Sequence, residues 1–337
     1  MRALDYPAWD ELVVTDRPRP DVAADEVIVR VAACGICGSE LETFASRSAR
    51  RTPPLIMGHE FCGTVEAVGA EVSSWRTGER VVSNAVVPCG DCVRCQRGDA
   101  NLCADRQVFG MHRMGAFAEF VAVPARCLIP WPENLPAEAA CLAEPLANGI
   151  HVVELVKHRA PQTAVVIGAG PIGLMCQQAL QVELDADVVV SDLVPERLAV
   201  ARRLGSRQLV APSELADAVR AWTDGEGVDL VVDAVGAEAT KRQSLDVCRP
   251  GGAVVWVGLH GDAMTLDSYG VTLPEKTIYG TYAAHLHELA TALEWMAAGR
   301  VDVRSWVQAF PLADGADAFH RMLAAQGDDL KAVLLPQ

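Results

Sequence analysis

Two hydrophobic patterns divide this chain of 337 residues. In the N-terminal part apolar and polar residues alternate, with glycines at the bends, as in residues 26–31 (EVIVRV) and 61–83. Such alternation is typical of half-buried antiparallel strands, so this part predicts a twisted β-barrel. From residue 164 onwards, continuous apolar runs such as AVVI (164–167) alternate with helical patterns, which predicts parallel strands buried on both faces.

The second pattern predicts a doubly wound α/β sheet. Strands are expected at residues 164–167, 188–191, 208–210, 228–233, 253–257 and 277–280, separated by helices at 174–184, 195–204, 214–223 and 238–247. Strands that alternate with helices in this way form one parallel sheet with right-handed crossovers. Further helices are expected at 136–153, 287–301 and 316–324, and a last strand at 332–335.

A glycine-rich turn follows the first strand of this sheet. It consists of Gly168, Gly170, Pro171, Ile172 and Gly173. The next strand ends in Asp192, 19 residues beyond the last of these glycines. This order is the context of a dinucleotide site, in which the glycines let the backbone approach a pyrophosphate at a helix N-terminus. Asp192 would bond the ribose hydroxyls and repel a 2′-phosphate, which favours NAD over NADP, although it also suits a helix N-terminus.

Further cofactor contacts are expected where the later strands end. Val235, Val257 and Leu259 follow the carboxyl ends of two strands, and cofactor crevices lie at that edge of such sheets. Arg197 argues against the preference for NAD, because a nearby arginine accommodates a 2′-phosphate in some proteins.

A first group of metal-ligand residues lies in the N-terminal part. Cys37 and His59 are 22 positions apart, and Glu60 follows the histidine. Thiolate, imidazole and carboxylate are ligands that zinc favours, and three protein ligands leave a fourth position open. Ser39 can reach a group bound there, and it can also cap the following helix. Glu144 lies in an apolar stretch and needs a partner, for which a metal is one candidate. A core cysteine and a turn histidine remain the alternative.

A second group has the spacing C-x2-C-x2-C-x7-C. It consists of Cys89, Cys92, Cys95 and Cys103, in a lobe at about residues 86–106. Four thiolates close a tetrahedral zinc site with no open position, so this zinc would be structural. An iron–sulfur cluster and a nucleic-acid-binding zinc ribbon are alternatives, but the cysteine segment carries as many aspartates as arginines.

Composition narrows the function classes. The net charge of −15 argues against nucleic acid or an anionic membrane as partner. The N-terminus MRALDYPAWD lacks the apolar region of a signal peptide, and we expect no membrane span. Without an export signal, eleven cysteines indicate reduced thiols and metal sites, so a cytoplasmic location is expected. We expect Lys331 and the pair His285 and His287 to be solvated, although Lys331 would also suit a phosphate.

The motifs GICGSE, GHE, the four-cysteine lobe, EPLA and VVIGAGPIG occur in this order. With them the chain resembles the zinc-dependent medium-chain dehydrogenases of the alcohol and polyol dehydrogenase superfamily. The resemblance implies a GroES-like barrel as catalytic domain, from residues 1–146 plus 283–337. It also implies a Rossmann NAD domain from residues 147–282.

The resemblance also implies roles for single residues. Cys37 and His59 match ligands of the catalytic zinc, and either Glu60 or Glu144 matches the third ligand. A glutamate at position 144 is similar to the polyol branch rather than to ethanol-type enzymes. Ser39 matches the hydroxyl that starts the proton relay, and Glu42 stands where ethanol-type enzymes have a histidine.

The implied activity is NAD-dependent interconversion of a secondary alcohol and its ketone. A polyol, sugar alcohol, cyclitol or amino-alcohol is expected as the small-molecule substrate. A homodimer or homotetramer with one catalytic and one structural zinc per chain is also implied. The rival interpretations are a simple secondary-alcohol dehydrogenase, a zinc-free enone or quinone reductase, and a non-enzymatic NAD-binding protein.

Overall fold

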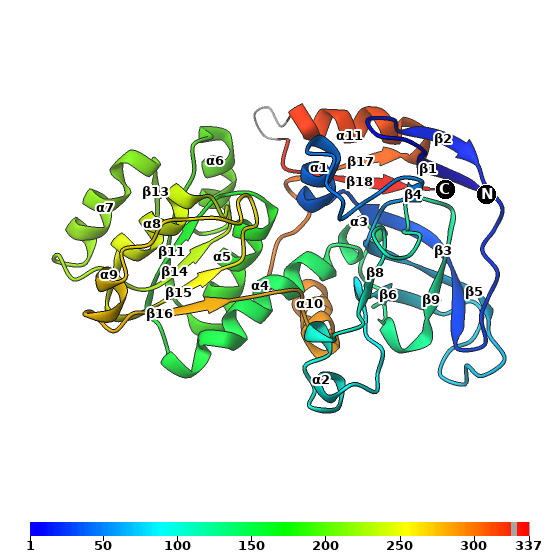
Figure 1. Ribbon diagram of the computed structural model, residues 1–337, viewed down its shortest axis with the longest axis horizontal. Coiled ribbons are helices and arrows are strands. Elements are labelled where there is room, and N and C mark those ends of the chain that lie inside the picture. The colour runs from blue at the N-terminus through cyan, green and yellow to red at the C-terminus, as the bar shows by residue number, and fades with distance from the viewer. Residues whose placement is uncertain (325–328, 337) are drawn as a thin grey trace. The chain divides into compact units, whose positions relative to one another are not determined.

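The computed structural model describes residues 1–324 and 329–336. The chain forms two compact units (Figure 1). Unit 1 comprises Met1–Ala147 and Ala283–Gln337, and unit 2 comprises Asn148–Tyr282. The boundaries expected from the sequence fall after residues 146 and 282.

Unit 2 is built on a six-stranded parallel sheet with the strand order β13-β12-β11-β14-β15-β16. The strands are β11 (Thr163–Ile167), β12 (Asp187–Ser191), β13 (Gln208–Val210), β14 (Val228–Asp233), β15 (Cys248–Trp256) and β16 (Thr277–Gly280). The connecting helices are α5 (Pro171–Leu184), α6 (Pro195–Arg203), α7 (Leu215–Trp222), α8 (Glu238–Asp246) and α9 (Tyr269–Thr272), with 3-10 helices η3 (Lys157–Arg159) and η4 (Pro212–Glu214). The strand order reverses between β11 and β14, so right-handed crossovers place helices on both faces (Figure 1).

The register of this sheet aligns the carboxyl ends of its central strands. Ile167 pairs with Ser191 on one side and with Asp233 on the other, and Asp233 pairs with Trp256. The loops that follow these four residues therefore leave the sheet at the same edge. Most of the expected cofactor residues lie in those loops, so residues as far apart in the sequence as Gly168 and Leu259 come to the same edge of the sheet.

Unit 1 is built on a seven-stranded sheet with the order β10-β6-β5-β3-β18-β17, in which β9 also pairs with β3. Its strands are β3 (Glu26–Gly35), β5 (Glu60–Val68), β6 (Arg80–Ser83), β9 (Phe120–Pro124), β10 (Leu128–Pro130), β17 (Val307–Pro311) and β18 (Lys331–Leu335). Smaller sheets are formed by β1 (Arg2–Tyr6), β2 (Val13–Asp16) and β4 (Leu55–Ile56), and by β7 (Val86–Val87) and β8 (Gln107–Val108). The C-terminal strand β18 pairs with β3 near the N-terminus, so blue and red ribbons lie together in Figure 1.

The helices of unit 1 lie between and after its strands. They are α1 (Gly38–Ala45), α2 (Val93–Gln96), α3 (Ala137–Ala140), α10 (Leu286–Ala297) and α11 (Gly315–Ala324), with 3-10 helices η1 (Ala100–Leu102), η2 (Ala125–Cys127) and η5 (Leu312–Asp314). The helix expected at 136–153 is two helices, α3 and the longer α4 (Ala143–Val156). The stretch Ala137–Arg159 is long and apolar enough to cross a membrane, but 83% of its most apolar window is buried in the protein, which is typical of a core helix.

Candidate active site

The first ligand group comes together where β3 ends and β5 begins. Cys37 lies between β3 and α1, His59 directly precedes β5, and Glu60 is the first residue of β5. The sulfur, ring nitrogen and carboxylate oxygen that these residues offer all lie within 4.8 Å of one another. Three such donors in one place fit a zinc ion and leave its fourth position open.

A buried carboxylate, Glu40, holds two of these ligands in position. Its Oε1 accepts hydrogen bonds from the amide of Gly58 (2.8 Å) and from Nδ1 of His59 (2.9 Å), and its Oε2 accepts one from the amide of Cys37 (3.0 Å). Because a carboxylate only accepts, Nδ1 of His59 must carry the proton, which leaves Nε2 for a metal. Gly58 has φ +101°, a conformation that directs its amide to Glu40 and favours glycine.

The charges around Glu40 keep it ionised. Burial raises the pKa of its carboxyl, but His59, Arg51 and the Cys37 amide outweigh burial and lower the pKa to about 2. Burial lowers the pKa of the His59 imidazole, and the neighbouring Glu40 and Cys37 raise it well above the usual value. Glu40 is therefore a permanent acceptor, although no sequence motif marked it as a site residue.

The other carboxylate, Glu60, is paired with a buried lysine. Lys331, in β18, forms an ion pair with Glu60 and donates to the carbonyl of Ile36 (2.9 Å). Burial lowers the pKa of Lys331, but the charges of Glu60 and Cys37 outweigh burial and raise it, so the ammonium stays charged. The expectation of a solvated or phosphate-binding Lys331 is wrong, because its side chain is only 3% exposed.

Close packing at this ion pair explains why position 35 in β3 is a glycine. Gly35 lies in β3 opposite Glu60, and a Cβ there would stand 2.1 Å from the Glu60 Oε2 atom. Glycine is therefore needed here because the Glu60 side chain approaches the backbone closely.

Ser39 and two further acids were also expected at the site. The cap of helix α1 is Cys37, not Ser39, and the Ser39 hydroxyl donates to the Cys37 sulfur (3.4 Å). Glu42 is exposed and accepts a hydrogen bond from Ser46 (3.2 Å). Glu144 is buried in the first turn of α4, but it is not part of the group formed by Cys37, His59 and Glu60. Glu60 is therefore the carboxylate that this arrangement favours as third ligand.

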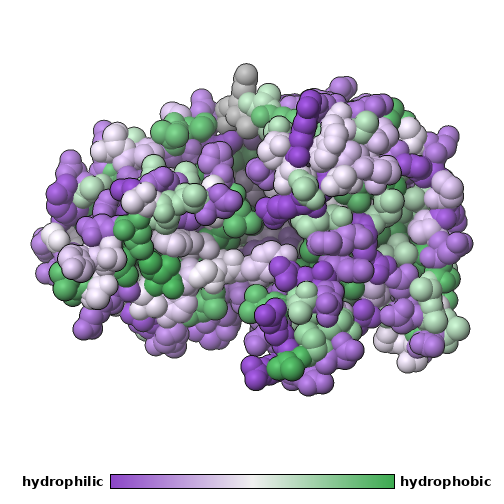
Figure 2. All heavy atoms as spheres, in the orientation of Figure 1, coloured by the Kyte–Doolittle hydropathy of each residue, from purple (hydrophilic) through white to green (hydrophobic). Residues whose placement is uncertain are grey.

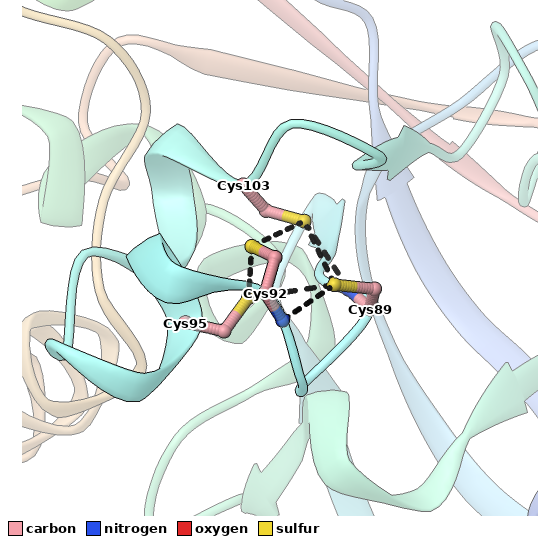
Figure 3. A group of neighbouring side chains, drawn as sticks. All are labelled: Cys89, Cys92, Cys95 and Cys103. Atoms are coloured by element: carbon pink, nitrogen blue, oxygen red, sulfur yellow. Dashed lines mark hydrogen bonds between the residues drawn. The ribbon is translucent and has the colours of Figure 1, made fainter.

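The four cysteines of the second group point toward one another (Figure 3). Strands β7 and β8 pair at the base of their lobe. The Sγ atoms are separated by 3.9 Å (Cys89–Cys95), 3.5 Å (Cys92–Cys95), 3.9 Å (Cys92–Cys103) and 3.4 Å (Cys89–Cys103). A tetrahedron with Zn–S bonds of about 2.3 Å has sulfurs about 3.8 Å apart. The lobe therefore fits a single zinc ion, whereas an iron–sulfur cluster, with several ions between its thiolates, needs wider spacing.

Backbone amides also favour thiolates in this lobe. The amide of Cys92 donates to the Cys89 sulfur (3.4 Å), and the amide of Cys89 donates to the Cys103 sulfur (3.3 Å). Backbone hydrogen bonds from Cys95 and Ala104 lower the pKa of the Cys92 thiol to about 6.

The glycine-rich turn of unit 2 has the geometry of a pyrophosphate site. Helix α5 begins after Gly170 with no side-chain cap, so its first amides are free to bind an anion. A Cβ on Gly170 would meet nothing within 4 Å, which leaves open space beside the backbone. A Cβ on Gly173 would instead stand 1.8 Å from the Gly168 carbonyl, so this glycine allows helix and strand to pack. Pro171 and Ile172 form the first turn of the helix.

Asp192 lies against the same turn. Its carboxylate accepts hydrogen bonds from the amides of Ala169 (2.6 Å) and Val194 (2.8 Å), which fixes it beside the glycine-rich loop with lone pairs left for a ribose. The buried Nε of Arg197 has no hydrogen-bond partner among the described residues, and a bound nucleotide would supply an acceptor.

The remaining expected cofactor residues follow β14 and β15. Val235 contacts the glycine-rich turn, because a Cβ on Gly168 would stand 2.7 Å from its Cγ2. Val257 is half-buried and donates its amide to the Asp233 carbonyl (3.0 Å). Leu259 is 61% exposed, although it lies at the edge of the sheet where a cofactor is expected.

Comparison with known proteins identifies the family of this chain. Residues 23–133 match the family described as "Alcohol dehydrogenase GroES-like domain", and residues 171–298 match "Zinc-binding dehydrogenase". D-arabitol-phosphate dehydrogenase of Enterococcus avium is 32% identical over 336 residues, which cover 97% of this chain and 95% of that protein. The chain belongs to the zinc-type medium-chain dehydrogenases. Sorbitol dehydrogenase of Bacillus subtilis (strain 168) is 30% identical, with 97% and 94% of the two chains covered.

A solved structure extends the likeness to the whole fold of this medium-chain dehydrogenase. A short chain alcohol dehydrogenase of Escherichia coli CFT073, complexed with NADH, has a TM-score of 0.92 at 28% identity and covers 99% of both chains. The predicted family and fold class are confirmed. So is the predicted class of enzyme, an alcohol or polyol dehydrogenase that uses zinc and a nicotinamide cofactor on a small molecule.

Proposed function

We propose that this dehydrogenase interconverts a secondary hydroxyl of a polyol, sugar alcohol, cyclitol or amino-alcohol with the ketone, using NAD. The observation that carries the proposal is the convergence of Cys37, His59 and Glu60 on one point with Ser39 beside them. The substrate class is supported by relatives named for sorbitol and for D-arabitol phosphate. The acids near the metal do not support it by themselves, because Glu40 bonds to His59 and Glu60 pairs with Lys331.

The residues of the site have separable roles. When bound, zinc polarises the substrate hydroxyl and the nicotinamide accepts a hydride. Cys37, His59 and Glu60 would hold the metal, and the hydrogen bond from Nδ1 of His59 to Glu40 leaves Nε2 available as the ligand atom. Ser39, whose hydroxyl lies 3.4 Å from the Cys37 sulfur, would accept the proton that leaves the substrate while it gives its own hydroxyl proton to water.

The decisive experiment is a substrate panel. The purified, zinc-loaded protein is given polyols, polyol phosphates, cyclitols, amino-alcohols and simple secondary alcohols, and NADH formation is followed. Turnover that is higher for hydroxyl-rich compounds supports the proposal. Better turnover of simple alcohols would replace it by the plain alcohol dehydrogenase, and reduction of enones by zinc-depleted protein would favour the reductase.

The preference for NAD over NADP is proposed on the position of Asp192. A 2′-phosphate beside this carboxylate would meet a like charge next to the glycine-rich turn. Replacement of Asp192 by glycine should raise KM for NAD and lower KM for NADP, with kcat changed less. Equal use of both cofactors by the wild type would contradict the proposal.

Two zinc ions per chain are proposed from the two ligand groups. Metal analysis of the wild type should give two zinc ions per chain, and the four-cysteine group should account for the more slowly exchanging ion because it has no open position. If the wild type contained only one zinc ion per chain, one of the two proposed sites, catalytic or structural, would be wrong.

Self-association is proposed on the free edge of the sheet in unit 2. Strand β16 is the edge strand of the sheet. In α9, which precedes β16, Tyr269 is 73% exposed, and Leu273, the residue directly after α9, is 77% exposed. Figure 2 shows apolar side chains on the part of unit 2 that carries α9. An edge strand with an apolar neighbour favours pairing with a second copy. Light scattering should give a dimer or tetramer, and Leu273→Asp should weaken it; a wild-type monomer would refute the proposal.

A cytoplasmic location is proposed on the state of the thiols. All eleven cysteines lie in the described part of the chain, and none forms a disulfide. Reduced thiols persist in the cytosol rather than in oxidising compartments. Fractionation of cells that make the protein should recover it with the cytosol, and recovery from an exported fraction would contradict this.

A further inference from the structure

A buried arginine outside the expected site residues contacts the relay serine. Arg51 is 2% exposed and donates four hydrogen bonds. Its Nε bonds to the Gly110 carbonyl (3.0 Å), and its Nη1 bonds to the Ser39 carbonyl (2.8 Å) and to the Thr43 hydroxyl (3.1 Å). Its Nη2 bonds to the Ser39 hydroxyl oxygen (3.1 Å).

The charge of Arg51 has no close counter-ion. In residues 1–324 and 329–336, no carboxylate lies within 4 Å of its guanidinium, and all four of its acceptors are neutral. Glu40 is a carboxylate whose charge interacts with it at longer range. A cation buried in this way is costly, and an apolar side chain of similar length would fill the same space without that cost. An arginine at this position is therefore explained by the hydrogen bonds that it donates, which an apolar side chain cannot make.

The chemistry of the guanidinium decides how the serine hydroxyl points. Arginine stays protonated and only donates, so Ser39 Oγ must be the acceptor of this hydrogen bond. The serine proton is then directed to a different acceptor, and in this structure that acceptor is the Cys37 sulfur. Arg51 thus turns the hydroxyl toward the group of metal ligands.

We propose that Arg51 is a positioning residue for the proton relay: it anchors the Ser39 oxygen and points the hydroxyl at the ligand group. The inference rests on the proposed function, in which Ser39 takes up the substrate proton. Arg51 also stabilises the partial negative charge that develops on the Ser39 oxygen when the serine hydroxyl proton passes to water. No atom of Arg51 reacts, and it keeps its charge throughout.

A double-mutant cycle separates this role from a structural one. The variants are Arg51→Met, Ser39→Ala and both together, and kcat and KM are measured with NAD and the best substrate of the panel. Arg51→Met should lower kcat about 10- to 100-fold, the effect of losing one hydrogen bond from a charged group, with KM changed less. In the Ser39→Ala background, Arg51→Met should lower kcat less than about threefold, because the serine hydroxyl that Arg51 bonds to is absent.

Two further variants complete the test. Arg51→Lys keeps the charge and one donor nitrogen, so its kcat should be higher than that of Arg51→Met. If Arg51→Met does not fold, Arg51→Lys takes its place in the cycle. Arg47→Met is the matched control, because Arg47 lies on the same loop, is exposed and pairs with Asp10. Its kcat should equal that of the wild type.

The outcomes distinguish the two proposals. If the wild type is active and the Arg51 and Ser39 effects multiply, Arg51 is structural and the inference is overturned. If KM rises while kcat is unchanged, it is overturned as well. If the wild type oxidises no alcohol although zinc and NAD are bound, the proposed function fails and the inference falls with it. Zinc content and thermal unfolding of Arg51→Met, equal to those of the wild type, support positioning over a folding defect.

Discussion

Replacement of Glu40 by glutamine tests whether this carboxylate positions the metal ligands. The change keeps the size of the side chain but turns one oxygen into a donor. If the new amide oxygen serves Gly58 and His59, the NH₂ group faces the amide of Cys37, which is also a donor. If the amide is reversed, two of the three hydrogen bonds are lost instead. At least one bond to a charged acceptor therefore disappears in either orientation.

The size of the effect follows from these bonds. A hydrogen bond to a charged group contributes about 1.5–3 kcal/mol, and the loss of one corresponds to a change in affinity of roughly 10- to 100-fold. Loss of a partner that orients a ligating histidine has a similar effect on metal affinity in other metal sites. We therefore expect Glu40→Gln to weaken one zinc site by about 10- to 100-fold and to leave the four-cysteine site unchanged.

The assay is competition with a chromophoric zinc chelator. In Glu40→Gln, one zinc per chain should transfer at a lower chelator concentration than in the wild type, and the other should not shift. Glu42→Gln is the matched control, because Glu42 is exposed on the same helix and its carboxylate accepts a hydrogen bond from Ser46 rather than from a metal ligand. Unchanged zinc affinity in Glu40→Gln would refute the positioning role and the assignment of His59 Nε2 to the metal.

Three further predictions concern other parts of the chain. Gly173→Ala places a Cβ 1.8 Å from the Gly168 carbonyl, so it should abolish NADH binding measured by fluorescence or prevent folding of unit 2. Asp229→Asn should lower the free energy of unfolding by roughly 2 kcal/mol at neutral pH. Burial raises the pKa of Asp229, but Arg249 and backbone amides outweigh burial and lower the pKa below its usual value. The stabilisation by Asp229 is therefore present above about pH 4 and is lost as the pH falls through the folded pKa. Denaturation measured across pH 3–7 checks this prediction. Cys103→Ser should reduce the zinc content to one per chain while nucleotide binding persists.

Unit 2 was predictable from the sequence because its signals are local. A parallel strand buried on both faces leaves a continuous apolar run, as in β11 and β14, whose predicted positions differ from the observed ones by one residue at most. The glycine-rich turn lies between strand and helix within a few residues of the chain. The bounds of β15 were less accurate, because Pro250, Gly251 and Gly252 interrupt its pattern although the strand begins at Cys248.

The ligands were also recognisable, but their support was not. Cys37 and His59 stand in short motifs, whereas the role of Glu40 depends on hydrogen bonds to residues 18 and 19 positions away. Lys331 lies 295 positions from the carbonyl that it bonds to, and it reaches the site only because β18 pairs with β3. A lysine or arginine is usually solvated, so nothing in the sequence marked Lys331 or Arg51 as buried.

The sequence by itself determined the chemistry that this chain can hold: which residue types serve as ligands, the spacing of the thiols, and the strand–turn–helix order of the nucleotide site. These are properties of neighbours in the chain, and local geometry preserves them. Tertiary structure alone decided which carboxylate stands with Cys37 and His59, and which buried cations face Glu60 and Ser39. Those choices depend on strand register and on the burial of charge, which arise only when distant segments pack together.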